Sequence, residues 1–120
     1  MDRGPHLERP VVKKLRSLCL AFPETIETNS WGHPNFRAGK KTFAAFEIIN
    51  NRPSIAFRLD AADVKRVLRE KNFFATPYGQ QRWVSMWVDA RVDWKRVSSL
   101  LERGYRTVAN KRMLKALDRD

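Results

Sequence analysis

An alternation of apolar and polar residues with a period of two constrains the fold of this chain more than any other feature of its sequence. Residues 54–59, SIAFRL, and residues 82–88, RWVSMWV, both place a large apolar residue at every second position. In an extended chain such residues share one side, which is typical of an antiparallel sheet with one buried side and one solvent-facing side. The residues expected to face the core are Ile55, Phe57, Leu59, Val84, Met86 and Val88.

Turn-forming residues divide the neighbouring segments into further strands. Residues 24–38 are rich in β-forming residues but contain a glycine and a proline, so we expect two short strands joined by a turn over residues 32–34. Residues 42–49, TFAAFEII, are typical of a strand. Residues 50–53, NNRP, are typical of a hairpin connection because asparagine tolerates a positive φ. A short strand is also expected over residues 73–76.

Three segments have the spacing and the end signals of amphipathic helices. The first begins at Pro10, which suits the first helical position, and is ended by Pro23. Asp60 and Asp93 are residue types that cap helix N-termini, so we expect a second helix that runs to about residue 71 and a third that follows Asp93. The apolar stripe of the third helix consists of Trp94, Val97, Leu101, Tyr105 and Val108.

Length and composition fit one small domain. The chain has 120 residues, and we expect a disordered basic tail over residues 1–9 and a single α+β domain over residues 10–117. Cys19 is the one cysteine and lies on the apolar side of the first helix. A single cysteine excludes an internal disulfide framework. No stretch approaches the roughly 18 apolar residues of a membrane helix, and the N-terminus lacks a secretory signal. We therefore expect a cytoplasmic protein without a membrane partner.

The charge of the chain favours polyanionic partners. Lysine and arginine number 24 against 13 aspartate and glutamate, which gives a net charge of +11. Such a surplus attracts polyanions. Nucleic acid is the commonest such partner, because its phosphates release their counterions when cationic side chains neutralise them.

Motifs in the first two thirds of the chain resemble those of the MmcQ/YjbR family. Residues 30–36, SWGHPNF, are followed by a Gly-Lys turn and by Phe43-Ala44, and together they resemble the family segment WGHPxF…GGKxFA. Residues 75–78, ATPY, with the later Trp83-Val84, resemble the family segment xAPYxxxxxWV.

The C-terminal part resembles the same family. Asp93-Trp94 and residues 105–111, YRTVANK, are similar to the family segment DWxEL…SYRLVAxKLPK. Arg112-Met113 replaces the usual Leu-Pro, so the last helix is expected to run further here. The resemblance covers roughly residues 10–112. It implies a frataxin-like (CyaY-like) fold, an antiparallel sheet with helices packed on one face, and DNA binding through a double-wing arrangement.

The expected function is therefore nucleic-acid binding, DNA in particular, through the phosphate backbone. A basic hairpin tip can act as a wing against phosphates, and cations at the end of the last helix can contact them as well. The alternatives are a solvated turn and a favourable interaction with the negative end of the helix. The expected phosphate contacts are Arg37, Lys40, Lys41, Arg82, Arg106, Lys111 and Arg112.

Aromatic residues beside cations give a second expected contact with nucleic acid. Trp83 and Trp87 share the side of their strand that faces away from the core, and Tyr78 lies in the preceding turn. Exposed aromatic rings stack on bases, which contributes about 1–3 kcal/mol for each base. In the alternative interpretation a loop or a second copy of the chain covers this face. The chain would then be a protein-interaction or regulatory module that forms a homodimer and binds polyanions only non-specifically.

Enzymatic and metal functions receive little support from the sequence. His33 suits acid–base catalysis, but only in a cleft beside a carboxylate such as Glu27 or Glu47; its placement between glycine and proline favours a structural role in a turn. The two histidines and the cysteine are scattered, and no phosphate-binding glycine motif occurs. We therefore expect no catalytic residue, no metal and no cofactor. Trp31, Phe36 and Tyr105 are expected to pack in the core.

Overall fold

The computed structural model describes residues 9–30, 32–77 and 79–119. Most of the expected tail, as well as Trp31 and Tyr78, lies outside the described residues. The elements are α1 (Pro10–Leu20), β1 (Thr25–Ser30), β2 (His33–Ala38), β3 (Lys41–Ile49), β4 (Arg52–Arg58), α2 (Ala61–Val67), β5 (Phe73–Ala75), β6 (Trp83–Trp87), α3 (Trp94–Val108) and α4 (Lys111–Asp118).

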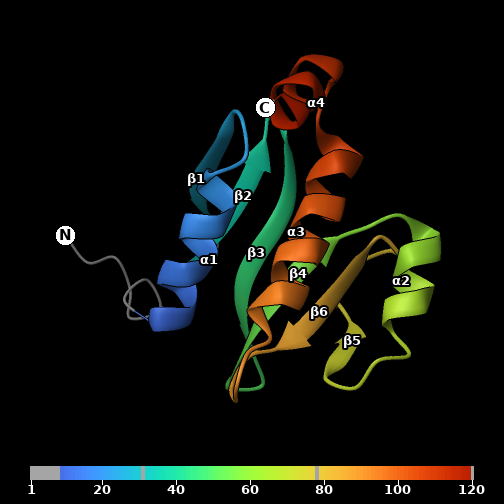
Figure 1. Ribbon diagram of the computed structural model, residues 1–120. Coiled ribbons are helices and arrows are strands. Elements are labelled where there is room, and N and C mark those ends of the chain that lie inside the picture. The colour runs from blue at the N-terminus through green and yellow to red at the C-terminus, as the bar shows by residue number, and fades with distance from the viewer. Residues whose placement is uncertain (1–8, 31, 78, 120) are drawn as a thin grey trace.

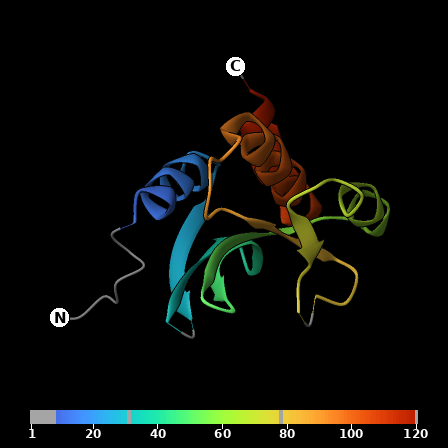
Figure 2. The same cartoon turned by 90° about the horizontal axis from the view of Figure 1, so that it is seen from below.

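The strands form one antiparallel sheet in the order β1-β2-β3-β4-β6-β5. Helices α1, α2 and α3 lie on the same face of this sheet and leave the other face open (Figures 1 and 2). The expected α+β class, with helices on one face of an antiparallel sheet, is therefore confirmed. None of the helices in the described ranges is both long and apolar enough to cross a membrane.

Two turns show how local chemistry sets the strand boundaries. Asn50 and Asn51 both have positive φ, 52° and 64°, and they connect β3 to β4 as the sequence indicates. The two short strands expected within residues 24–38 are confirmed, but the turn between them ends before His33, because His33 already pairs with Ser30 inside the β1–β2 ladder. Pro34 is tolerated in β2 because the ladder to β3 begins only at the next residue.

The helix-covered face of the sheet carries the core. Cross-strand pairing aligns Phe36, Ala44, Phe57 and Val84 in one row, and all four are fully buried. The expected core positions Ile55, Leu59, Met86, Val88 and Tyr105 are buried as well. Cys19 is also in the core, where burial raises the pKa of its thiol.

Helix α3 packs directly on the central strands because of a glycine. A Cβ atom at Gly104 would lie 2.6 Å from the carbonyl oxygen of Arg58 and 3.2 Å from that of Phe43. The next residue, Tyr105, stacks on Phe22 with ring centres 4.8 Å apart and donates a hydrogen bond to the carbonyl of Pro23 at 2.7 Å. Helix α3 is therefore packed closely against the sheet, and the hydroxyl of Tyr105 has a hydrogen-bond partner.

The C-terminal helix does not run on as expected. The backbone of Ala109 is extended, and the side chain of Asn110 accepts a hydrogen bond from the Met113 amide at 2.9 Å, which starts the separate helix α4. The second helix also ends earlier than expected, at Val67. Met113 of α4 lies against Gly39 in the β2–β3 turn, so α4 is placed beside that turn.

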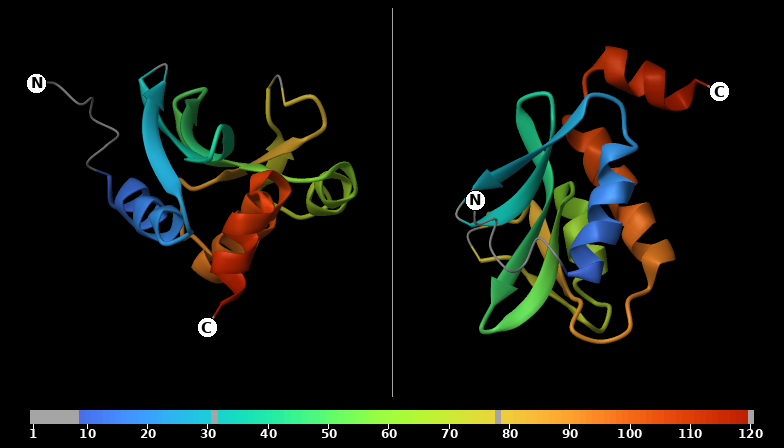
Figure 3. Two further views of the ribbon diagram at one scale, coloured as in Figure 1. Left: turned by 90° about the horizontal axis from the view of Figure 1, so that it is seen from above. Right: turned by 90° about the vertical axis from the view of Figure 1, so that its left-hand side faces the viewer.

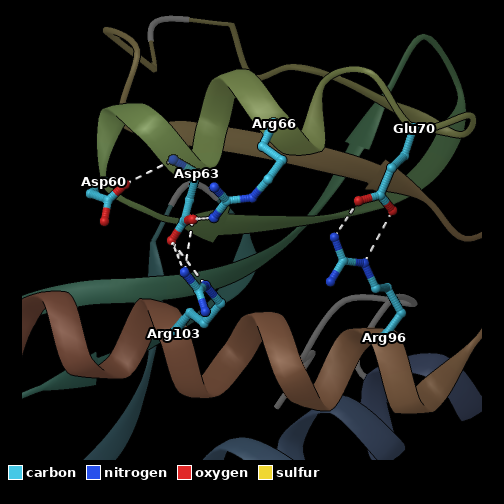
Figure 4. A network of polar contacts seen from close by, with 6 residues as sticks. All are labelled: Asp60, Asp63, Arg66, Glu70, Arg96 and Arg103. Carbon is cyan, nitrogen blue, oxygen red and sulfur yellow. Dashed lines mark hydrogen bonds and ion pairs between the residues drawn. The ribbon is translucent and has the colours of Figure 1, made fainter.

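Polar contacts fasten α2 to α3 (Figure 4). Asp60 caps α2 by accepting from the Asp63 amide at 2.8 Å. The buried carboxylate of Asp63 accepts two hydrogen bonds from Arg103 of α3, at 2.9 and 2.8 Å, and also pairs with Arg66. Arg96 of α3 reaches Glu70, which follows α2. Bidentate arginine–carboxylate pairs of this kind fix orientation, so the short helix α2 is held in place at both ends.

Candidate functional site

Cations gather at one end of the sheet because neighbouring antiparallel strands run in opposite directions. The strands β2 and β4 end here, and β3 and β6 begin here; Arg37 pairs with Thr42, and Arg58 pairs with Trp83. Each of the four strands brings a cation to this end, and the β2–β3 turn adds one more. We call this region the cationic end; its strand and turn cations are Arg37, Lys40, Lys41, Arg58 and Arg82.

Two helices add cations to the same end. Because Met113 lies against Gly39, the first turn of α4 brings Lys111 and Arg112 close to the β2–β3 turn. Arg106 of α3 lies with Arg58 and Arg82 around a pocket of about 550 Å³. The structure thus brings the seven cations expected from the sequence to one end of the molecule.

The cations of this end differ in how far they are already paired. Arg106 forms ion pairs with Glu102 and Asp118, and these hydrogen bonds raise the pKa of its guanidinium. Arg112 donates to both carboxylate oxygens of Glu24, at 2.7 and 2.6 Å, which lowers the pKa of that carboxyl. Arg37 donates a hydrogen bond to the Lys40 carbonyl at 2.7 Å. Within the described part of the chain, the side chains of Lys40, Lys41, Arg82 and Lys111 form no hydrogen bond or ion pair.

Arg58 and Arg103 belong to this end but were not predicted from the sequence. The pocket that they share with Arg106 also contains the carboxylate of Asp63, which Arg103 already neutralises. The Nε atom of Arg58 is buried and has no hydrogen-bond partner among the described residues. The sequence does place Arg58 near the end of a predicted strand. Whether that strand end lies beside the other cations depends on the strand order, which the sequence pattern does not give.

The open face of the sheet holds a second candidate site. Strands β1 and β2 and the β5–β6 connection extend away from the helices at the two sides of this face (Figure 3). A pocket of about 220 Å³, which we call the open-face pocket, lies on this face. Its lining consists of Asn35, Thr42, Ala45, Glu47, Ala56, Thr76, Pro77, Gly79 and Trp83.

The floor of the open-face pocket is made of small residues. Ala45 pairs with Ala56, and Ala56 pairs with Ser85, so three small side chains lie in a row across the central strands. All three are buried, which corrects the expectation that this whole side is solvent-facing. The hydroxyl groups of Ser85 and Thr76 are hydrogen-bonded to each other at 2.7 Å.

Glu47 is the carboxylate of this pocket and has no hydrogen-bond donor among the described residues. It is half-buried, and burial raises the pKa of its carboxyl, while the nearby His33 partly offsets this shift. No described residue donates a hydrogen bond to the Glu47 carboxylate, whereas Glu27, the other candidate neighbour of His33, is held by Arg16 at 2.7 and 3.2 Å. The Nδ1 atom of His33 is likewise buried without a partner among the described residues.

The two tryptophans of β6 share the open face, as expected, but their surroundings differ. Trp83 lines the open-face pocket. The ring of Trp87 stacks on Phe74 with centres 4.1 Å apart, and the guanidinium carbon of Arg52 lies 4.0 Å from its centre. Trp87 is therefore already engaged by two neighbours, and Trp83 is the better candidate for stacking on a ligand. Tyr78, the third expected stacking residue, is outside the described residues.

Comparisons with known proteins identify both sequence and fold similarity. A model of the YjbR family matches residues 20–107. The fold is similar to that of a Deinococcus radiodurans protein with a DUF419 domain, at 20% identity and a TM-score of 0.72, covering 88% of this chain and 86% of that one.

Two further solved structures are similar at lower identity. A Pseudomonas syringae protein has 12% identity and a TM-score of 0.68, covering 80% of this chain and 97% of that one. A Bacillus subtilis protein of the DUF1801 family has 13% identity and a TM-score of 0.58, covering 81% and 76%. At these identities the similarity shows the fold alone, and the frataxin-like comparison stays a prediction. A search of curated proteins found no significant match.

Proposed function

The chain belongs to the YjbR family, and from this premise and the cationic end of its sheet we propose that it binds nucleic acid through the phosphate backbone. The observation that carries the proposal is the gathering of Lys40, Lys41, Arg82 and Lys111 at one end, where none of the described residues forms an ion pair with them. DNA is named ahead of RNA because the family resemblance implies DNA.

The pairing state of each cation predicts its contribution. An unpaired lysine or arginine gains a charge-assisted hydrogen bond to phosphate without giving up an existing one. Arg106 and Arg112 would have to leave or share their carboxylates, so their net gain is smaller. We therefore expect the four unpaired cations to provide most of the affinity. Such contacts position a duplex but do not read its sequence.

The test is a fluorescence-anisotropy titration of duplex DNA, single-stranded DNA and RNA at about 50, 100 and 200 mM salt, a range over which phosphate contacts weaken strongly. The variant replaces Lys40, Lys41, Arg82 and Lys111 with alanine. It should lose most of its affinity for DNA, and its salt slope should flatten by roughly 0.9 for each phosphate contact removed.

A control variant with the same loss of charge separates a binding site from a general charge effect. Arg69, Lys71, Arg91 and Lys95 are exposed and lie near the start of β5 or α3, at the opposite end of the sheet. Their replacement with alanine should leave most of the affinity intact. Equal losses in the two variants, or equal competition by heparin for both, would show that the charge acts only as a property of the whole surface.

A further inference from the structure

We propose that the open-face pocket binds a planar nitrogen heterocycle that presents two adjacent N–H donors, with guanine as its form in nucleic acid and Glu47 as the acceptor. The base site rests on the pocket alone. Its use on a nucleic-acid strand rests in addition on the proposed function.

Glu47 differs from the other carboxylates of the described ranges in its hydrogen bonding. The other carboxylates in the described ranges each accept a hydrogen bond, either from an arginine or from the backbone of a helix that they cap. Glu47 accepts none and is half-buried. A charged group that is withdrawn from water without a partner is costly. A ligand with N–H donors would supply the missing hydrogen bonds.

The pocket is small and has one aromatic side chain in its lining. Ala45 and Ala56 form a shallow floor on two neighbouring strands, and Trp83 and Pro77 belong to the walls. The volume of about 220 Å³ is below the roughly 300–1,000 Å³ of pockets for drug-sized ligands. Aromatic walls favour flat rings, because single bases are commonly bound by stacking on such side chains. The pocket therefore suits one small ring system.

The carboxylate of Glu47 selects the edge by which the bound ring is held. A carboxylate binds most strongly where two parallel N–H groups meet its two oxygens. Among the DNA bases, guanine alone has two neighbouring donors on its Watson–Crick edge, its N1–H and its 2-amino group. Adenine and cytosine place an acceptor beside their amino group, and thymine has one N–H between two carbonyls. Glu47 thus favours guanine over the other three bases.

The open-face pocket lies next to the cationic end. Thr42 of its lining follows Lys41 directly, and Trp83 follows Arg82. A base in the pocket would therefore have the unpaired cations at the side of its sugar and phosphate. Free nucleotides and unpaired bases of a strand share this chemistry, and the experiment distinguishes them.

The base site is tested with nucleosides, which carry no phosphate and so bypass the cationic end. Guanosine, inosine and adenosine are titrated into the full chain, and binding is followed by tryptophan fluorescence and calorimetry. Inosine is the most informative comparison, because it differs from guanosine only in lacking the 2-amino group. We expect guanosine to bind at least about tenfold more tightly than either of the others. Equal affinity for guanosine and inosine would overturn the proposal.

Two variants test the acceptor and the pocket separately. Glu47→Gln should reduce guanosine binding by at least about tenfold, because its amide places a donor opposite a donor. Glu27→Gln is the matched control, since that carboxylate lies on the helix-covered side with Arg16, and it should bind as the unchanged protein does. Ala56→Val fills the floor without altering Glu47 and should also abolish binding. Full binding by either pocket variant would overturn the proposal.

Oligonucleotides distinguish the source of the base and separate this proposal from the previous one. A thymine strand with a single central guanine is compared with the same strand carrying inosine. Preference for the guanine strand places the site on nucleic acid, whereas guanosine binding without strand preference assigns it to free nucleosides or nucleotides. Strand binding that depends on Lys40 and Lys41 but ignores guanine, together with no guanosine binding, would refute the base site and leave the phosphate contacts standing.

Discussion

The two faces of the sheet are built from the same strands but differ in residue composition and in what they contribute to the protein. On the helix-covered face, neighbouring strands present Phe36, Phe57 and Val84, which are fully buried. One position further along, the open face presents Ala45, Ala56 and Ser85, and the two alanines line a pocket. The first face stabilises the fold through apolar burial. The second face leaves space and a carboxylate that no described residue pairs with; these contribute little to stability and are suited to a ligand.

The contrast extends to the polar groups. Near the helices, two buried polar groups have partners: the hydroxyl of Tyr105 donates to the carbonyl of Pro23, and Asp63 is neutralised by Arg103. On the open face, Glu47 and the Nδ1 atom of His33 lack partners among the described residues. Unsatisfied polar groups of this kind call for an explanation, and here they lie in or beside a pocket.

The largest expected effect tests the difference between the faces directly. Phe57 and Ser54 are both fully buried on β4 but face opposite sides. Phe57→Ala should reduce the free energy of unfolding by about 3–5 kcal/mol, because it leaves a cavity in the core. Ser54→Ala removes only a hydrogen bond to the Glu47 carbonyl and should cost about 1 kcal/mol. Urea denaturation measures both, and equal losses would contradict the assignment of stability to one face.

A smaller effect is expected where α3 approaches the sheet. Gly104→Ala should reduce the free energy of unfolding by about 1–3 kcal/mol, because the added methyl group meets the Arg58 carbonyl and α3 must shift. Lys95→Ala, at an exposed position of the same helix, serves as the control and should change little. Thermal unfolding of both variants checks the prediction. An unchanged melting temperature for Gly104→Ala would show that the helix does not need this close approach.

The smallest effect concerns the pH dependence of Glu47. Burial raises the pKa of its carboxyl in the folded protein, so the folded state holds the proton more tightly than the unfolded chain does. The resulting contribution to stability is complete below the unfolded pKa and is lost as pH rises through the folded pKa. Glu47→Gln does not titrate, so its stability relative to the unchanged protein should increase across this window.

The difference is expected to stay within about 0.5 kcal/mol, as for most substitutions outside the core. Urea denaturation at several pH values on both sides of the window measures it, with Glu27→Gln as the control. A relative stability of Glu47→Gln that falls with rising pH would mean that the carboxylate has a partner in solution.

Local patterns in the sequence predicted much of the fold. A period of two decides which residues of β4 and β6 share a side, and the capping chemistry of Asp60 and Asp93 marks where two helices begin. These features depend on residues that are close in the chain. The extent of the turn expected at residues 32–34 and the continuous last helix were wrong, because strand pairing at His33 and the Asn110 cap overrode the local signals.

The sequence by itself determined the composition of the site but not its geometry. The positive charge and the individual cations follow from residue types, and so does the outward side of Trp83. The tertiary structure alone decided that four strands and α4 bring those cations to one end, because strand order is not a local property. It also decided that Phe74 and Arg52 contact Trp87, while Glu47 lies beside two alanines without a hydrogen-bond donor from any described residue. Whether a polar group lacks a partner depends on every neighbour that folding brings near it.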